Sequence, residues 1–557
     1  MTYEKEIPDY AMVPAKEIEE KIIVPVTKGA IYSPVQVTNI TEKPKTVITI
    51  EEDILVPDTK PDLREILLID GRARLASREI DQMGKGDDHI SLAGEIELQT
   101  LYMPENQQVS GPVIAVQTRV PFKEQWHTGL ASGATLTASC KVEKIDYMVI
   151  NERKYRVKIS LAISARECVD SKVDVFEGIT GEEIQMLREK VEITNIALRK
   201  KDTLSISEIL EIKEDETFEA VLKQDITVVE NYKQLTGEKL VVNGFIFVNL
   251  LYTVAGSGEA GPEGEGAHQK TDCIRQARER VEFTQFIPVS GGSGSEVCFD
   301  GSGLRVRLVS DEELGEVLKL EGEIITHVEV YRTMEKEIIV DGYHREKDFV
   351  CDFGEKTSRV MVGTTAGESS VREIISPDQG YGDVEKIIYT TGEIASAGSH
   401  CEQGKVITEG SVLAKIICQS RPSKDAQPQI FSMRQEVPFR VVANGAQLSG
   451  DEMVSDRIYI KDIWAEKINN KQIEFNAAVV CSGELMRQVP FKVLVNPAFE
   501  EKTVKERAVP MVVYITRKGD SLWSVAKKFK TTMESIIQLN QLEEGVLHPG
   551  QKLLILK

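Results

Sequence analysis

The side chains that could carry acid–base, nucleophilic or metal chemistry are scattered along the 557-residue chain. The seven histidines lie far apart, mostly in polar or glycine-rich surroundings where a solvated imidazole is the usual state. His400 and Cys401 are adjacent, but neighbours on a strand point to opposite faces, so we do not expect them to bind one metal ion. The motifs HExxH, GxSxG and GxxxxGKS/T do not occur. We therefore predict no catalytic residue, no metal and no cofactor, and a protein that is not an enzyme.

The eight cysteines form no CxxC pair, and most lie in strand-like apolar runs such as TASCKV and AVVCSG. Cysteines in such runs are usually buried thiols. Because disulfides are rare in the cytosol, this pattern is typical of a reduced, cytosolic protein.

Acidic side chains outnumber basic ones by 89 to 68, which gives a formal net charge of -21. Surplus negative charge repels phosphate groups and argues against nucleic acid or anionic lipid as partners. The N-terminal residues lack the basic region and apolar core of a secretory signal. No stretch is apolar for long enough to cross a bilayer. We expect no membrane insertion and a protein that stays in the compartment that made it.

Two short strand-like runs, Met511 to Thr516 and Lys552 to Leu556, enclose two helical patterns at the C-terminal end. Asp520 or Ser521 can cap the first helix. Its apolar residues recur at the spacing of one helical face and are Leu522, Val525, Ala526 and Phe529.

The second helical pattern begins at Thr531, whose hydroxyl can cap the helix. The Glu534 side chain can accept a hydrogen bond from the Thr531 backbone N–H, which would complete a capping box. Asn540 suits the left-handed conformation that ends a helix, and Pro549 with Gly550 predicts a turn. The residues expected to face inward are Ile536, Ile537 and Leu539. The predicted order is strand, helix, helix, strand.

This segment resembles the LysM family at nearly every diagnostic position. The matching residues are Gly519, Asp520, Ser521, Leu522, Trp523, Ala526, Phe529, Asn540, Leu542 and the run Pro549 to Leu553. In LysM domains the two strands pair antiparallel, both helices pack on one side, and N-acetylglucosamine polymers lie in a shallow groove between two loops. The resemblance implies a ligand or partner site at Gly519, Asp520, Ser521, Leu522, Leu542, Val546, Leu547, His548 and Pro549. Turns, caps and core packing would also select several of these residues, so the pattern predicts the fold more directly than glycan binding.

The first 500 residues contain three similar segments. Each has an apolar run that opens with Gly and carries Tyr or Cys eight residues later, at Gly94 to Tyr102, Gly244 to Tyr252 and Gly410 to Cys418. A second run is centred on Val-Pro-Phe at residues 120–122 and 437–439, with Val-Glu-Phe at 281–283 in the middle copy. A short helical or turn piece is expected ahead of each Gly run, at residues 63–67, 218–222 and 371–375.

Apolar and polar residues alternate along these segments with the two-residue period of half-buried strands. We predict a mainly β chain, with three tandem β-sandwich or barrel-like repeat domains followed by a small βααβ domain. The glycine-rich stretches 255–267 and 290–303 are expected to be long hairpin loops. The expected division is 1–39 for an N-terminal extension, 40–195, 196–345 and 346–495 for the repeats, 496–510 for a linker, and 511–557 for the LysM domain.

The repeats resemble the SPOCS repeats of SipL-like spore-coat proteins. The resemblance includes the run that precedes residues 63–67, which is Val56-Pro57-Asp58-Thr59-Lys60-Pro61-Asp62. SPOCS-like repeats combined with a C-terminal LysM domain indicate this family more specifically than either feature alone. The resemblance implies a scaffold in the mother-cell cytoplasm of an endospore-forming bacterium, at the forespore surface. It also implies that the LysM domain docks onto the coat-basement morphogenetic ATPase, stage IV sporulation protein A.

Two other functions stay open at this point. One is a cell-wall accessory protein that binds peptidoglycan or another N-acetylglucosamine polymer, although the lack of an export signal disfavours it. The other is a phage baseplate or tail component, since these proteins also carry LysM modules.

Overall fold

The computed structural model describes most of the chain. The described residues are 22–25, 29–76, 79–81, 89–106, 112–127, 131, 133–212, 217–255, 273–311, 315–377, 381–421, 429–444, 448, 450–501, 511–542 and 546–556. The predictions for residues 1–21 and for most of the stretch 255–267 therefore lie outside the described residues.

The chain is mainly β, as predicted, with two short helices near the C-terminus. The strands are β1 (Ile22–Pro25), β2 (Ala30–Glu42), β3 (Thr46–Leu55), β4 (Leu63–Leu75), β5 (Glu79–Asp81), β6 (His89–Pro104), β7 (Ile114–His127), β8 (Thr135–Asn151), β9 (Lys154–Ile179), β10 (Ile184–Ile209), β11 (Phe218–Leu235), β12 (Lys239–Val254), β13 (Ile274–Pro288), β14 (Gly294–Asp300), β15 (Arg305–Asp311), β16 (Gly315–His344), β17 (Asp348–Ile375), β18 (Val384–Glu402), β19 (Lys405–Ser420), β20 (Ile430–Asn444), β21 (Met453–Asn469), β22 (Gln472–Glu501), β23 (Met511–Ile515) and β24 (Lys552–Leu556). The helices are α3 (Leu522–Phe529) and α4 (Met533–Asn540).

One strand order occurs three times along the chain. A three-stranded antiparallel sheet, β4-β6-β7, β11-β12-β13 or β18-β19-β20, faces a second sheet built around a long strand, β9, β16 or β22. We call β2–β9 the first unit, β10–β16 the second and β17–β22 the third, and the three together the body. Both sheets of each unit contribute to its core, as Ile96 and Tyr155 do in the first. The sheets stay open, and the described strands close no barrel.

The repeated Gly and Phe residues of the sequence face each other across neighbouring strands. Gly94 pairs with Phe122, and the same register joins Gly244 to Phe283 and Gly410 to Phe439. Phe283 keeps this position although Glu282 replaces the Pro of the other two units. The middle unit therefore differs in sequence without differing in strand register.

The pieces expected to be helical ahead of each Gly run are strands, so that prediction was wrong. Residues 63–67 and 218–222 open β4 and β11, and residues 371–375 end β17. Two β-bulges lie within each of the segments 63–70, 218–225 and 384–391, which occupy equivalent places in the three units. Each bulge adds a residue and breaks the two-residue alternation. Apolar residues then recur three apart, as at Leu63 and Ile66, and imitate a helical period.

Two other expectations about connections differ from the structure. Residues 290–303, expected to be a loop, include the strand β14. Strands β2, β10 and β22 run across positions 39/40, 195/196 and 495/496, where boundaries were expected, because each long strand serves both its unit and the stem described next. Residues 502–510 of the expected linker lie outside the described residues.

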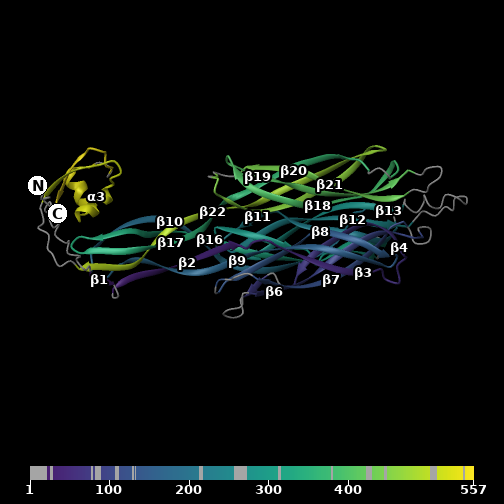
Figure 1. Ribbon diagram of the computed structural model, residues 1–557, viewed down its shortest axis with the longest axis horizontal. Helices are drawn as coiled ribbons and strands as arrows, with labels where there is room; N and C mark the ends of the chain where they lie inside the picture. Colours follow the sequence, from purple (N-terminus) through teal and green to yellow (C-terminus); the bar gives the residue numbers. More distant parts are fainter. Residues whose placement is uncertain are drawn as a thin grey trace, which may run out of the picture.

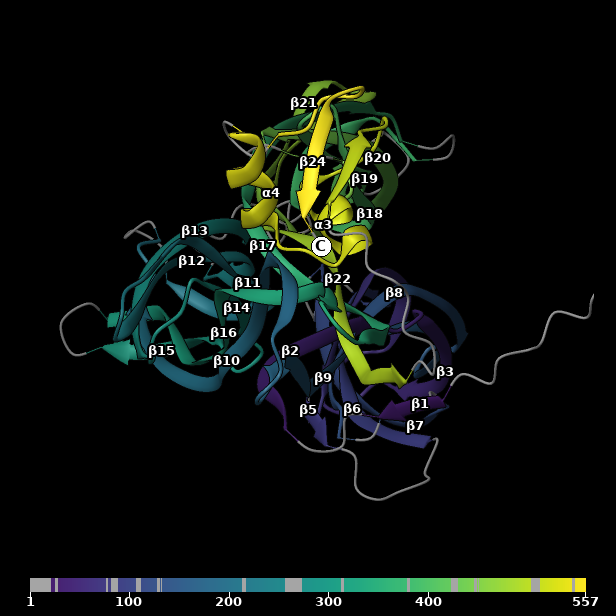
Figure 2. The same ribbon diagram turned by 90° about the vertical axis from the view of Figure 1, so that its left-hand side faces the viewer.

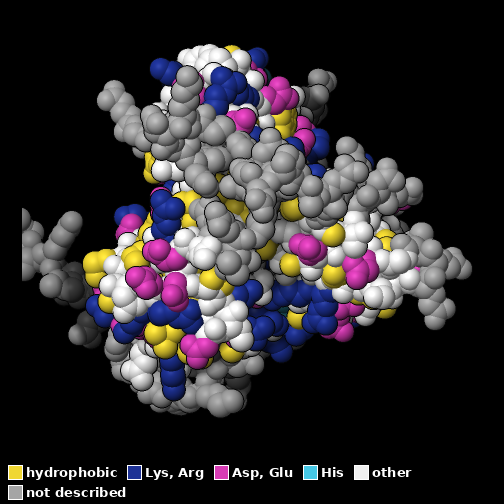
Figure 3. Space-filling model, turned by 90° about the vertical axis from the view of Figure 1, so that its right-hand side faces the viewer, with side chains coloured by type: hydrophobic (Ala, Val, Ile, Leu, Met, Phe, Trp, Pro, Cys, Tyr) yellow, Lys and Arg dark blue, Asp and Glu magenta, His cyan; other side chains and the backbone are white. Residues whose placement is uncertain are grey.

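The body is elongated, and its long strands extend beyond the individual units into a common stem (Figure 1). One apolar core in the stem joins strands of all three units and includes Val37, Val175, Ile193, Ile338 and Val493. Seen along the long axis, the three units surround this stem (Figure 2). The opposite end, which we call the head end, presents three lobes, with Lys and Arg side chains gathered between two of them (Figure 3).

Buried charges also join the units. Lys223 is fully buried, with its ammonium 2.8 Å from Asp70 of the first unit and 2.6 Å from Asp225 of its own. Burial opposes the charged form, but the two carboxylates outweigh burial and raise the pKa of Lys223. The equivalent positions in the other units hold Leu68 and Tyr389. The second unit therefore places a cation where the others place an apolar or aromatic side chain.

A second inter-unit network involves arginines. Arg166 of β9 lies 2.9 Å from Glu296 of β14 and 2.7 Å from Glu329 of β16. Arg457 of β21 lies 2.8 Å from Glu230 of β11. These pairs are largely buried, so breaking one would leave an uncompensated charge. They fix the relative placement of the three units.

Candidate functional site

The C-terminal module, residues 511–556, is built from β23, α3, α4 and β24, so the predicted order is confirmed. β23 and β24 pair antiparallel, from Met511 opposite Leu556 to Ile515 opposite Lys552. The helices pack on these strands through a core that includes Val525, Ala526 and Ile536.

Helix α3 is capped as the sequence suggested. The Ser521 hydroxyl accepts a hydrogen bond from the Ser524 backbone N–H, and the Ser524 hydroxyl accepts one from the Ser521 N–H, which forms a capping box. Lys530 ends the helix in the left-handed conformation, with φ of 53°. The chain therefore turns sharply between the two helices.

Helix α4 differs from the prediction at both ends. Thr532 is the N-cap, because Thr531 is buried and its N–H bonds to the Ala526 carbonyl. Gln541, not Asn540, adopts the left-handed conformation that ends the helix. The Asn540 amide instead joins α4 to β24: its nitrogen donates to the Ile536 and Leu554 carbonyls, and its oxygen accepts from the Leu554 N–H.

The predicted groove residues lie in two loops that the structure places side by side. Thr516, at the start of the first loop, accepts a bond from the Gln551 N–H and donates to the His548 carbonyl of the second. Its own carbonyl accepts from the Gly550 N–H at 2.8 Å. The ends of the two loops are therefore joined by hydrogen bonds.

Exposure divides the predicted residues into two groups. The exposed ones are Gly519, Ser521, Val546, His548 and Pro549. Leu522, Leu542 and Leu547 are partly buried and pack against the core of the module. The Asp520 carboxylate accepts bonds from the Arg517 N–H and the Tyr514 hydroxyl, and these bonds lower its pKa. Asp520 therefore orders the first loop, and the exposed residues are those free to contact a ligand.

The module also docks onto the body, a contact that sequence reasoning missed. Asp341 near the end of β16 accepts a bond from the Trp523 indole at 2.8 Å and from the Lys527 ammonium at 2.6 Å. The Tyr343 hydroxyl donates to the Thr531 carbonyl, and its ring meets that of Trp523 edge to face, with centroids 5.0 Å apart. Lys530 forms an ion pair with Asp348 at the start of β17.

This contact is apolar as well as polar. Tyr343 and Leu187 of the body pack in the same cluster as the core of the module. Burial, with the nearby Glu534, raises the pKa of Tyr343 to about 12, so its hydroxyl stays a donor at neutral pH. The α3 side of the module is thus occupied by the body, while both groove loops keep exposed residues. Figure 1 places the module at the end of the stem.

The described part of the chain offers no group of three or more His, Cys, Asp or Glu side chains arranged to hold a metal ion. Within that same part, no helix has the length and apolar character needed to cross a membrane.

Two family models match the chain. Residues 514–556 match the model described as LysM domain, and residues 62–150 match the model described as SipL, SPOCS domain. The predicted resemblance to SipL-like proteins with a LysM domain is confirmed. The SPOCS match lies in the first unit, from β4 to β8, so the assignment of three SPOCS repeats stays a prediction.

Curated relatives match over short segments. "Probable autolysin SsaALP" of Staphylococcus aureus is 47% identical over 38 residues, which are 7% of this chain and 14% of that protein. "N-acetylmuramoyl-L-alanine amidase sle1" of Staphylococcus epidermidis is 49% identical over 43 residues, 8% of this chain and 13% of that protein. "Uncharacterized protein YkzQ" of Bacillus subtilis is 37% identical over 46 residues, 8% and 61% of the two chains.

The similarity to the amidases concerns the LysM region. The chain thus spans about one seventh of the autolysin and less than two thirds of each of these relatives. No solved structure matches the chain significantly.

Proposed function

The chain carries a SipL SPOCS domain at residues 62–150 and a LysM domain at residues 514–556, and we infer that it is a non-catalytic scaffold of spore-coat assembly. We propose that its LysM groove docks onto the coat-basement morphogenetic ATPase, stage IV sporulation protein A, at the forespore surface. The partner follows from the resemblance to SipL-like proteins. The two matched domains are binding modules, which supports a role without catalysis.

The observation that carries this proposal is the placement of the LysM domain on the body. Trp523, Lys527 and Lys530 are engaged by Asp341, Tyr343 and Asp348, so the α3 side is not free for a partner. Val546, His548 and Pro549 stay exposed. The groove loops are therefore open to a protein partner, whereas the α3 side is not.

The test is a pull-down of the ATPase from sporulating cells with the full chain carrying Val546→Glu. Val546 has 55% of its surface exposed, so the substitution places a charge in the groove without opening the core. Val513→Glu is the matched control, because Val513 is 64% exposed on β23, outside the predicted groove. We expect V546E to lose most of the captured ATPase and V513E to retain it.

Two results would contradict the proposal. Equal capture by the wild type and V546E would exclude the groove as the docking site. Equal capture by the full chain and by a version ending near residue 505 would exclude the LysM domain altogether.

A second candidate function is peptidoglycan binding, favoured by the similarity of the LysM region to proteins named as an autolysin and an N-acetylmuramoyl-L-alanine amidase. It predicts that the purified full chain sediments with cell-wall sacculi and that V546E abolishes sedimentation while V513E does not. Sedimentation without capture of the ATPase would favour this function over the first.

A further inference from the structure

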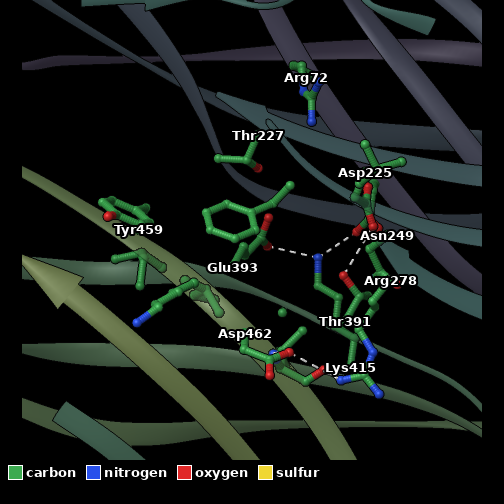
Figure 4. Close-up of a pocket in the computed structure, with 18 of the residues that line it drawn as sticks. Arg72, Asp225, Thr227, Asn249, Arg278, Thr391, Glu393, Lys415, Tyr459 and Asp462 are labelled. Carbon is green, nitrogen blue, oxygen red and sulfur yellow. Dashed lines mark hydrogen bonds and ion pairs between the residues drawn. The ribbon is translucent and has the colours of Figure 1, made fainter. Parts of the chain in front are cut away.

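A cleft of about 800 Å³ lies where the three units meet in the body. Strands β4 and β6 of the first unit, β11, β12 and β13 of the second, and β18, β19 and β21 of the third contribute to its walls (Figure 4). Its volume is within the range of ordinary ligand sites, which often lie between domains. The groove of the LysM domain is not part of it.

Most charges in the cleft are neutralised by the protein itself. Lys415 bonds to Asp70 and lies 2.8 Å from Glu393, and Asp225 is paired with Lys223. Asn249 donates to the Tyr389 hydroxyl and accepts from Gln276. These groups hold the units together and are not available to a ligand.

The wall from the first unit is different. Arg72 lies directly opposite Glu97 in the β4–β6 register, where a cross-strand ion pair would be expected. The Glu97 carboxylate forms an ion pair with Arg305 of the second unit instead, at 2.7 Å. Arg72 then makes no hydrogen bond or ion pair with any residue that the structure describes, and it extends into the cleft beside Thr227 (Figure 4).

A buried acceptor lies on the same strand pair. Gln99 occupies the position equivalent to Asn249 and Lys415, but its Oε1 atom is buried and has no hydrogen-bond partner. A buried acceptor without a partner costs about 1–3 kcal/mol. In the walls from the second and third units, the rings of Phe247 and Tyr459 stack, with centroids 6.4 Å apart and an interplanar angle of 30°. The cleft thus offers donors at Arg72, an acceptor at Gln99 and an aromatic wall.

We propose that this cleft binds a short peptide segment of a partner protein that places an Asp or Glu carboxylate on Arg72. A guanidinium binds a carboxylate through two parallel hydrogen bonds. A peptide N–H supplies the donor that Gln99 lacks once the Gln99 side chain turns its buried oxygen into the cleft, and the aromatic pair packs on the peptide chain. The net charge of -21 repels polyanions, so a single carboxylate fits better than a nucleic acid or polyphosphate.

Saturation-transfer NMR on the purified full chain tests this directly, with N-acetyl-Gly-Glu-Gly-amide as the probe. The matched peptide with Gln in place of Glu, and inorganic phosphate, are the competing ligands. We expect transfer to the Glu peptide, at least about tenfold weaker binding of the Gln peptide, and no displacement by phosphate. Equal binding of both peptides, or displacement by phosphate, would overturn the proposal.

Three variants locate the site. Arg72→Gln is expected to weaken Glu-peptide binding about tenfold, whereas Arg332→Gln, at an exposed arginine of β16 outside the cleft, leaves it unchanged. Arg305→Gln in an Arg119→Gln background leaves Arg72 as the arginine opposite Glu97, so Glu97 is expected to pair with Arg72 and weaken peptide binding, although Arg305 is not a proposed ligand contact. Binding that survives both R72Q and R305Q in that background would exclude Arg72 as the carboxylate site.

Discussion

Gly94 lies directly opposite Phe122, and a Cβ atom on Gly94 would stand 2.6 Å from the Phe122 ring and 2.2 Å from the Arg74 carbonyl oxygen. The equivalent Cβ atoms at Gly244 and Gly410 would lie 2.5 Å and 2.9 Å from their Phe partners. Each Phe therefore covers its neighbouring strand at a place where only a hydrogen atom fits. The repeated Gly and Phe of the sequence are one structural feature.

Gly94→Ala is expected to lower the free energy of unfolding by about 3 kcal/mol, since the added methyl group meets both backbone and ring. Urea unfolding followed by circular dichroism measures the change. Gly398→Ala is the control, because nothing lies within 4 Å of a Cβ there, and we expect a change below about 0.5 kcal/mol. Similar losses for both variants would mean that close packing is not the cause.

Lys223→Leu is expected to destabilise the protein by about 3–5 kcal/mol, although Leu68 occupies the equivalent place in the first unit. The reason is that the partly buried Asp225 then has no cation, while Asp70 still has Lys415. Adding Asp225→Asn should recover more than half of the loss. Equilibrium unfolding of both variants checks this, and a double variant less stable than K223L would contradict it.

The ionised Glu296 side chain should make the free energy of unfolding depend on pH in the acid range. Burial alone would raise its pKa, but Arg166 and the Tyr331 hydroxyl outweigh burial and lower the pKa to about 2. Because the value is below the unfolded one of about 4.3, the stabilisation is complete above pH 4.3 and is lost as pH falls towards 2. The stability gap between wild type and Glu296→Gln should therefore close over this range.

Urea midpoints at a series of pH values measure that gap. Glu335→Gln serves as the control, because Glu335 pairs with Lys190 on the exposed surface and is expected to matter little at any pH. A gap for E296Q that stays constant from pH 5 to pH 2.5 would contradict the assignment.

Asp341→Asn is expected to loosen the contact between the LysM domain and the body, because Lys527 loses its ion pair and Trp523 a charged acceptor. Acrylamide quenching of Trp523, with Trp126 and Trp464 replaced by Phe, reports the change, since Trp523 is 8% exposed when docked. We expect quenching to increase in D341N. Asp352→Asn, at a carboxylate that accepts from Asn496, is the control. Unchanged quenching in D341N would show that Asp341 does not hold the module.

The LysM fold could be predicted because its signals are local. Ser521 and Ser524 lie within one turn of each other, so the sequence alone indicates the cap. Asn540 was placed at the right position with the wrong role, because its partner Leu554 lies fourteen residues away on β24. Thr531 is not the cap, because it is buried and its N–H bonds to the Ala526 carbonyl, which leaves the capping position to Thr532.

The body could be predicted only in outline. Alternation indicated strands, and Gly with Val-Pro-Phe indicated the repeat, but paired bulges made residues 63–67 and 218–222 look helical. The cleft could not be predicted at all. The sequence predicts an ordinary cross-strand ion pair between Arg72 and Glu97. In the structure Glu97 pairs with Arg305 instead, which is more than 200 residues away in the sequence. Such competition between distant arginines for one carboxylate leaves no local pattern.

Strand β22 extends over 30 residues, from Gln472 in the third unit to Glu501, with a β-bulge at Asn496 and Pro497. At about 3.3 Å per residue, it measures on the order of 100 Å. Strands β16 and β17 run beside it as part of the same stem. Because the C-terminal module packs on Asp341 of β16 and Asp348 of β17, the spacing between this module and the head end is set by the length of these strands.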